Sequence, residues 1–155
     1  MRWTFVIFFL LCLIVFPDWN QYACAQEKDT NESDTVTSAK QTFAVKEVFR
    51  EIEQSLQKNT IEELENIFTP MVSVTIGQGT HGYYSSNQAF SIISGYLSER
   101  HLISVEFSQL FVNGATPYAT GRLFYIQKGV RESVQVYVSL VYSDSLWCIN
   151  QFNIY

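Results

Sequence analysis

Residues 118–142, YATGRLFYIQKGVRESVQVYVSLVY, contain two long stretches in which apolar and polar side chains alternate. Alternation with a period of two is typical of a β-strand that buries one face. Lys128-Gly129 interrupts the pattern, and a short interruption with glycine favours a turn between antiparallel strands. The stretch therefore predicts a β-hairpin of two long strands, 118–127 and 130–142.

Two further strands are expected on either side of this hairpin. They are LISVEFSQLFV at 102–112 and LWCINQFNI at 146–154. Asn113-Gly114 and Ser143-Asp144-Ser145 lie in the gaps, and both are typical turn sequences. Short connections between four strands predict an antiparallel meander.

The sequence before residue 100 predicts helices and one strand. Apolar residues at the three-to-four spacing of an amphipathic helix indicate a helix at 41–57; they are Val45, Val48, Phe49, Ile52 and Leu56. Thr60 and Glu63 fit a capping box, which begins a short second helix that ends at Thr69-Pro70. The alternating MVSVTIG at 71–77 then predicts a strand.

The stretch GQGTHG at 77–82 has three glycines and predicts a turn and chain reversal, with His81 in the turn. Ser85 stands three residues before Gln88, so we expect a second capping box and a helix at 86–99. Helices followed by a run of strands predict an α+β fold rather than an alternating α/β fold.

This order of elements resembles the NTF2-like, cystatin-like cone, in which N-terminal helices pack on a curved, mostly antiparallel sheet. Within that superfamily, residues 45–155 resemble the DUF4783 family of small exported bacterial domains. The stretches that carry the resemblance are Leu64–Phe68 with Val72-Ser73-Val74, Gly82-Tyr83-Tyr84-Ser85 with Gln88-Ala89, Tyr118-Ala119-Thr120-Gly121, Val136-Tyr137-Val138 and Ile149–Ile154. The resemblance implies a fold but no activity, because none is established for the family.

The N-terminus has the features of a secretory signal peptide. Arg2 precedes an apolar run, Phe5–Phe16, that is shorter than the roughly 20 residues of a membrane span. Small residues favour cleavage after Ala25, and lipidation of Cys24 is the less favoured alternative. We therefore expect an exported, periplasmic or secreted protein with no membrane span after cleavage. Its predicted parts are a signal peptide at 1–25, a flexible polar tether at 26–40 and one domain at 41–155.

Composition excludes several classes of partner and cofactor. The net charge is −5 and no cluster of Lys and Arg is present, which argues against nucleic acid as a partner. His81 and His101 have no second ligand three or four residues away, so no metal site is predicted. Cys148 fits a small, inert residue in a strand, and no cofactor is expected.

No catalytic residue is predicted either. An isomerase of the ketosteroid type needs an aspartate base, but the aspartates fall in the signal peptide, the tether and a turn: Asp18, Asp29, Asp34 and Asp144. Glu106 and Glu132 lie in strands, where Glu106 shares its face with serines and Glu132 adjoins a turn, so both fit exposed charges.

Five polar positions are the weak candidates for a pocket. Tyr118 and Arg122 share one face of their strand, and Tyr137 alternates with valines in the next. Together they would hold a small anionic or polar ligand if they faced into the cone; the favoured alternative is that the tyrosines lie at its rim. The resemblance adds Gln109 and Gln135, which stand where the family often has histidine and arginine, so the roles of those family residues are not carried over.

Association with a second copy is a further expectation. The series Val134, Val136, Val138 and Leu140, with Tyr125 and Phe152, has apolar surface for both a core and an interface. The sequence thus predicts an exported, non-catalytic NTF2-like domain that binds a small polar ligand or a protein partner and can form a homodimer. The alternative is a cone-fold enzyme, of the isomerase or dehydratase kind, with an unrecognised acid or base.

Overall fold

The computed structural model describes residues 30–58 and 60–155, with side chains from Ser38 onward. The chain divides between Ala39 and Lys40 into two units, and the second, Lys40–Tyr155, is the domain described below. The proposed signal peptide, its cleavage site and Cys24 lie outside the described residues. The division into signal, tether and domain therefore stays a prediction.

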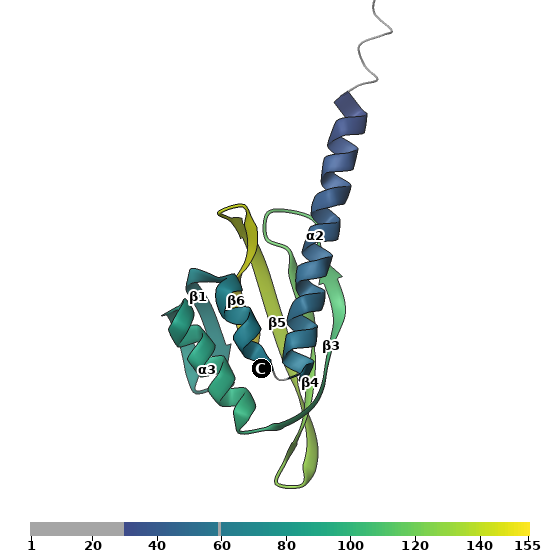
Figure 1. Cartoon of the computed structure of the whole chain (residues 1–155). Coiled ribbons are helices and arrows are strands. Elements are labelled where there is room, and N and C mark those ends of the chain that lie inside the picture. Colours follow the sequence, from purple (N-terminus) through teal and green to yellow (C-terminus); the bar gives the residue numbers. More distant parts are fainter. Residues whose placement is uncertain (1–29, 59) are drawn as a thin grey trace, which may run out of the picture. The chain divides into compact units, whose positions relative to one another are not determined.

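The elements follow one another in nearly the expected order (Figure 1). They are α2 (Thr30–Lys58), the 3-10 helix η1 (Ile61–Ile67), β1 (Phe68–Ile76), β2 (Thr80–Ser85), α3 (Ser86–Ser98), β3 (His101–Phe111), β4 (Tyr118–Gln127), β5 (Val130–Ser143) and β6 (Leu146–Ile154).

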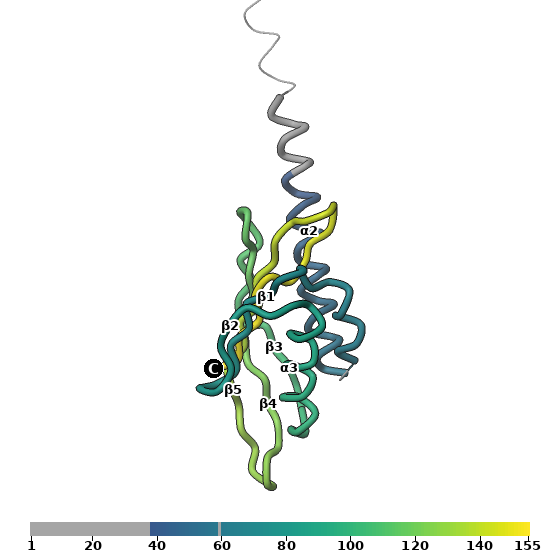
Figure 2. The backbone as a smooth tube through the Cα atoms, turned by 90° about the vertical axis from the view of Figure 1, so that its left-hand side faces the viewer, coloured from purple at the N-terminus to yellow at the C-terminus, as the bar shows by residue number. Residues whose placement is uncertain are grey.

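One six-stranded sheet forms the body of the domain, in the order β2-β1-β6-β5-β4-β3. The last four strands form the expected antiparallel meander, and β1 enters the sheet parallel to β6. From Lys40 on, the helices lie on one side of the sheet and the opposite side has no helix over it (Figure 2). This arrangement confirms the α+β fold class and leaves one sheet face open.

Helix α2 is longer than expected, because it begins at Thr30 and not near residue 41. Residues 30–58 contain no glycine or proline, so nothing in the backbone interrupts the helix. Its predicted apolar stripe is confirmed: Val45, Phe49, Ile52 and Leu56 are buried. Among the residues that the structure describes, no helix is long and apolar enough to cross a membrane.

The capping box predicted at Thr60 is wrong. The element that follows is a 3-10 helix, and the Thr60 side chain makes no capping hydrogen bond. Glu63 instead accepts a hydrogen bond from the Ser55 hydroxyl at 3.1 Å, which ties η1 back to the end of α2. A 3-10 helix tightens the turn, so the spacing that suits an α-helical box no longer brings each side chain to the backbone amide of the other residue.

The glycine-rich stretch forms a β-hairpin and not one long turn. Only residues 77–79 make the reversal, and His81 lies in β2, paired with Thr75 of β1. Strand β1 also starts three residues earlier than expected, at Phe68. The Thr69 hydroxyl, which is buried, donates to the carbonyls of Met71 and Ile149 at 2.7 and 3.1 Å and holds the irregular start of β1 against β6.

Helix α3 begins with the capping box that the sequence predicts. The amide of Gln88 donates to the Ser85 hydroxyl, and the Gln88 side chain accepts from the Ser85 amide at 3.1 Å. Ala89, Ile93 and Leu97 are the buried face of this helix. Ser85 thus caps α3 and Ser86 is its first residue, as expected.

Strand β3 is bent by two register irregularities, one of them between Phe107 and Gln109. At this point the Phe107 amide donates a 2.7 Å hydrogen bond to the carboxylate of Glu53 in α2. Across the strand pair, a Cβ on Gly121 would lie 1.9 Å from the carbonyl oxygen of Glu106. The bend therefore depends on Gly121 in β4, which allows the close approach, and on the Glu53 carboxylate of α2, which accepts a hydrogen bond from the Phe107 amide at the bulge.

Candidate functional site

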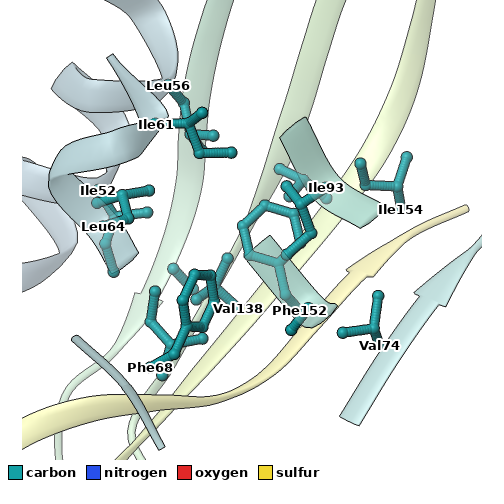
Figure 3. Packing of buried hydrophobic residues seen from close by; sticks show 14 of the residues in the cluster. Ile52, Leu56, Ile61, Leu64, Phe68, Val74, Ile93, Val138, Phe152 and Ile154 are labelled. Carbon is teal, nitrogen blue, oxygen red and sulfur yellow. The ribbon is translucent and has the colours of Figure 1, made fainter. Parts of the chain in front are cut away.

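The space between the helices and the sheet is filled with apolar side chains (Figure 3). Phe49 and Ile52 of α2 pack in one cluster with Phe152 of β6 and Leu123 of β4. The series Val136, Val138 and Leu140 also belongs to this core and is fully buried. These residues are therefore part of the core, and association into a homodimer stays a prediction.

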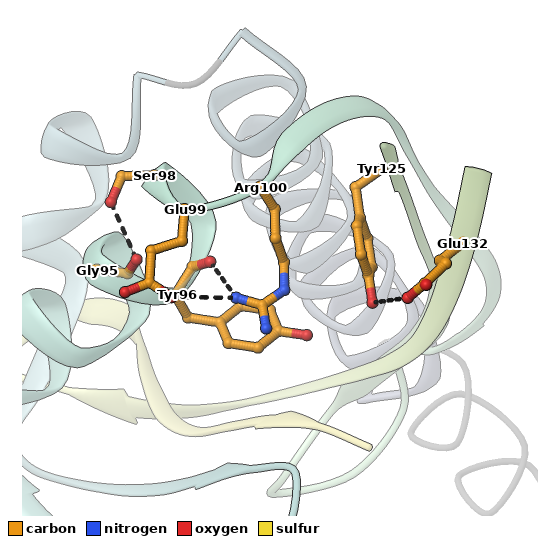
Figure 4. A network of polar contacts seen from close by, with 7 residues as sticks. All are labelled: Gly95, Tyr96, Ser98, Glu99, Arg100, Tyr125 and Glu132. Atoms are coloured by element: carbon orange, nitrogen blue, oxygen red, sulfur yellow. Dashed lines mark hydrogen bonds and ion pairs between the residues drawn. The ribbon is translucent and has the colours of Figure 1, made fainter. Parts of the chain in front are cut away.

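A polar cluster lies at the end of α3, beside this apolar interior (Figure 4). The Arg100 guanidinium lies 3.5 Å from the ring centroid of Tyr96 and donates to the Tyr96 carbonyl at 2.8 Å. It also lies 5.6 Å from the ring centroid of Tyr125, whose hydroxyl donates to the carboxylate of Glu132 at 3.2 Å. Sequence reasoning missed this cluster, because its members come from the end of α3, from β4 and from β5.

The cluster makes the Tyr96 hydroxyl harder to ionise. Burial is the main cause that raises its pKa, and the positive charge of Arg100 opposes the rise. Arg100 also has its Nε buried with no hydrogen-bond partner among the described residues. The cation is thus stabilised by the two aromatic rings, one carbonyl and an ion pair with Glu99 at 3.9 Å.

The five sequence candidates all lie on the open face of the sheet. Ala119 and Leu123 of β4 are in the core, so Tyr118 and Arg122, which alternate with them, point away from the helices. Strand pairing then aligns Tyr137 with Thr120, and Gln135 with Arg122. Gln109 pairs with Thr120 from the other side. The structure brings these residues together, but on the outside of the sheet and not in a pocket under the helices.

Two cross-strand rows run over this face and include most of these candidates. Row 1 is His81, Thr75, Asn153, Tyr137, Thr120 and Gln109, in the order β2-β1-β6-β5-β4-β3. Row 2 is Tyr83, Ser73, Gln151, Ser139, Tyr118 and Phe111, in the same order. Each row has one residue from every strand, so the open face is a continuous band of hydroxyl, amide and aromatic groups.

Three aromatic rings stack across one half of the band. The ring of Phe111 lies 4.4 Å from that of Tyr118, with 19° between their planes. Tyr118 lies 5.4 Å from Tyr137, at 26°. Offset stacks of this kind hold the rings in fixed positions and leave the hydroxyl groups of the tyrosines at the surface of the sheet.

Asn153, near the centre of row 1, is a buried polar side chain on the open face. It is 2% exposed, and its Nδ2 donates to the Tyr155 hydroxyl at 2.9 Å. Its Oδ1 is buried and has no hydrogen-bond partner in residues 38–58 and 60–155. A buried acceptor left unpaired costs about 1–3 kcal/mol, so this amide is the least satisfied polar group on the face.

The histidines, Glu106 and Cys148, which the sequence analysis considered, are not grouped into a reactive site. The Thr75 hydroxyl and His81 Nδ1 are 3.1 Å apart and hydrogen-bond across β1 and β2, while His101 and Glu106 are exposed. Cys148 is half-buried, and burial raises the pKa of its thiol, which makes it a weak nucleophile. Within the described part of the chain, no group of three His, Cys, Asp or Glu residues is placed to hold a metal.

Shallow hollows on the helical side of the described domain are further candidates. One, of about 350 Å³, is lined by Tyr84, Asn87, Gln88, Ser91 and Ile92 beside the start of α3. A second, of about 150 Å³, is lined by α2 and η1 and includes the Ser55–Glu63 pair. The first has no acidic or basic side chain. The second has Glu51, Lys58 and Glu63, but Glu63 is used in the contact between η1 and α2, so neither improves on the open face as a candidate site.

Known structures show what this chain is similar to. A DUF4783 family protein from Bacteroides uniformis has 14% identity and a TM-score of 0.59, with 66% of this chain and 91% of that chain covered. A second DUF4783 protein, from Bacteroides fragilis, has 14% identity and a TM-score of 0.59, over 66% and 92% of the two chains. An NTF2-like protein with a cystatin-like fold from Novosphingobium aromaticivorans has 10% identity and a TM-score of 0.57, over 83% and 90%.

These structural similarities confirm the NTF2-like fold, but they do not indicate a function. No curated protein is significantly similar to the sequence. Residues 49–155 match the sequence pattern of a family described as a domain of unknown function, which is more than half of the chain. The protein therefore belongs to the DUF4783 family.

Proposed function

We propose that this chain is an exported, non-catalytic binding module that binds through the open face of its sheet. The observation that carries the proposal is that the two faces of the sheet differ in the side chains they present. The face toward the helices packs the core, while the other presents two ordered rows of polar and aromatic side chains. The packed interior supports a proposed site on the outer face of the sheet.

Export is part of the proposal and rests on the sequence. Arg2, the apolar run Phe5–Phe16 and the small residues before Gln26 support cleavage after Ala25 and release into the periplasm or the medium. Lipidation at Cys24 is the alternative, and it would keep the domain at a membrane surface.

A cone-fold enzyme is the second candidate function, and one observation favours it. The Tyr125 hydroxyl and the Glu132 carboxylate are hydrogen-bonded next to the Arg100 cation, which is the kind of grouping that can move a proton. Against this candidate, the Arg100 guanidinium is held between two rings, and Tyr125 is 5% exposed, so a substrate would have to displace packed side chains.

Native mass spectrometry on protein recovered from its own host tests the proposal. Thr120→Arg places a long charged side chain in row 1, on β4, and Glu62→Arg places the same side chain on η1, away from the band. We expect a non-covalent component in the wild type and in Glu62→Arg that is lost in Thr120→Arg. A component that persists in Thr120→Arg would place binding elsewhere, and no component in the wild type would contradict the small-ligand form of the proposal.

The same spectra measure the export prediction. A mass that begins at Gln26 supports cleavage after Ala25, whereas a mass that carries acyl chains at Cys24 supports the lipoprotein alternative.

A further inference from the structure

The two rows of the open face carry almost no charge. Their twelve side chains are hydroxyls, amides, aromatic rings and one histidine. The charged residues of this face lie outside the two rows. They are Glu106 and Arg122, which are register partners on β3 and β4, and Arg131 of β5, whose guanidinium lies 5.3 Å from the ring centroid of Phe124. A surface with many donors and acceptors but no net charge is complementary to a neutral ligand rather than to a phosphate, sulfate or carboxylate.

The band is long and narrow. Six strands at about 4.8 Å spacing give a band about 24 Å long across the sheet. Hydroxyl and amide groups recur at every strand of row 1, from Thr75 to Gln109. A regular array of this length is suited to an extended oligomer with hydroxyl groups along it, and it exceeds the length of a single small ring.

The amide of Asn153 is the group on this band with the most to gain from a ligand. Its unpaired Oδ1 can accept from one ligand hydroxyl, and its Nδ2 can donate to another. Only Tyr155, whose side chain is 60% exposed, holds the Nδ2 side. The Asn153 side chain is 2% exposed, so a ligand reaches its donor and its acceptor only by displacing the Tyr155 ring, and this displacement is part of the inference.

Aromatic surface lies at both ends of the band. Tyr83 on β2 is 77% exposed, and Phe111 on β3 is 48% exposed at the end of the stacked row. Exposed ring faces pack against the C–H faces of saturated rings, while the amides and hydroxyls between them bond to ring substituents. A ligand with alternating hydroxyl edges and C–H faces satisfies both parts of the band.

We propose that the open face binds a neutral, polyhydroxylated chain, a glycan without acidic groups, laid across the strands along rows 1 and 2 with Asn153 at its centre. The inference rests on the proposed binding function and adds the class of ligand.

Affinity electrophoresis of the purified protein in gels that contain one polysaccharide each tests the ligand class. The neutral probes are glucomannan, xylan and soluble starch, and the acidic probes are alginate and heparin. We expect at least one neutral probe to retard the protein and the acidic ones to leave it unchanged. Because no ion pair is involved, retardation should be the same at about 0.05 and about 0.5 M NaCl.

Variants locate the site. Tyr137→Ala and Asn153→Leu are expected to weaken retardation by about tenfold or more, since each removes a central contact of row 1. Gln109→Ala changes an exposed residue and should not disturb the core. It should weaken retardation by a smaller factor, so that a folding defect in Tyr137→Ala or Asn153→Leu would not leave the site untested. Glu62→Ala on η1 is the matched control and should bind like the wild type.

Three results would overturn the ligand class. They are no retardation by any neutral probe, retardation by alginate or heparin that Arg122→Ala abolishes, and a dimer in light scattering that Tyr137→Ala dissociates. In each case the native mass spectra of Thr120→Arg decide separately whether the open face is a binding surface at all. The ligand class can therefore fail while the binding function stands.

Discussion

Gly121 is the residue whose replacement should most clearly disrupt the shape of the sheet. An added Cβ would lie 1.9 Å from the Glu106 carbonyl oxygen and 2.8 Å from the Phe107 Cα, and both are backbone atoms. An ordinary contact needs at least 3.4 Å, so β3 and β4 would have to separate by more than about 1 Å. A separation of this size breaks the ladder hydrogen bonds at the bulge.

The cost follows from these two effects. Overpacking of a fitted site costs about 1–3 kcal/mol. Each ladder hydrogen bond that is lost adds about 1 kcal/mol. We therefore expect Gly121→Ala to lower the free energy of unfolding by about 3 kcal/mol, which corresponds to a fall in Tm of roughly 10 °C for a domain of this size.

Urea unfolding followed by far-ultraviolet circular dichroism measures this change. Gly95→Ala is the matched control, because a Cβ there meets nothing within 4 Å, and alanine in the middle of α3 should raise stability by about 1 kcal/mol. A Gly121→Ala protein within about 0.5 kcal/mol of the wild type would refute the reasoning. It would mean that the close approach of β3 to β4 is not a constraint in solution.

Three further changes test other contacts. Glu53→Ala should cost about 2 kcal/mol in urea unfolding, because it leaves the Phe107 amide without its acceptor; an unchanged midpoint would contradict this. Ser85→Ala should cost about 1 kcal/mol through loss of the capping box, which thermal unfolding measures. The raised pKa of Tyr96 favours the folded state below the ordinary tyrosine value of 10.0, and this contribution is lost as pH rises through the higher folded pKa. In an alkaline absorbance titration, Tyr96→Phe should therefore remove one tyrosine that ionises above the ordinary tyrosine pKa, and an unaltered curve would exclude this.

The sequence predicts most of the fold because most of its signals are local. Alternation in β4 and β5 and the turn between them need only neighbouring residues, and Lys128 and Gly129 do adopt the positive φ angles, +51° and +79°, of a two-residue hairpin turn. The capping box at Ser85 is equally local.

Strand β2 was missed because its sequence looks like a turn. Gly82 lies inside the strand, and two more glycines precede it, so composition favours a loop over the whole stretch. What makes it a strand is pairing with β1, where Gly82 is opposite Val74. An edge strand can use glycine there because its stability comes from the ladder and not from its own side chains.

The candidate site was predicted only in part, for a similar reason. Alternation places Tyr118 and Arg122 on one face, but it does not say whether that face meets the helices. Asn153 joins the site through the parallel pairing of β6 with β1, where it lies beside Thr75. No local pattern specifies a contact between strands that are so far apart in the sequence, so the centre of row 1 was not foreseen.

The register of β6 explains how an unsatisfied amide persists on the open face. Phe152 and Ile154 alternate with Asn153 and are both buried in the core. A slip by one residue would turn Asn153 toward the apolar core and turn Phe152 and Ile154 out of it, at about 2–3 kcal/mol for each of the two apolar side chains. This loss exceeds the 1–3 kcal/mol that an unpaired Asn153 acceptor costs. The core therefore holds the amide in place without satisfying it, and a hydroxyl that reaches Oδ1 from the open face recovers the difference.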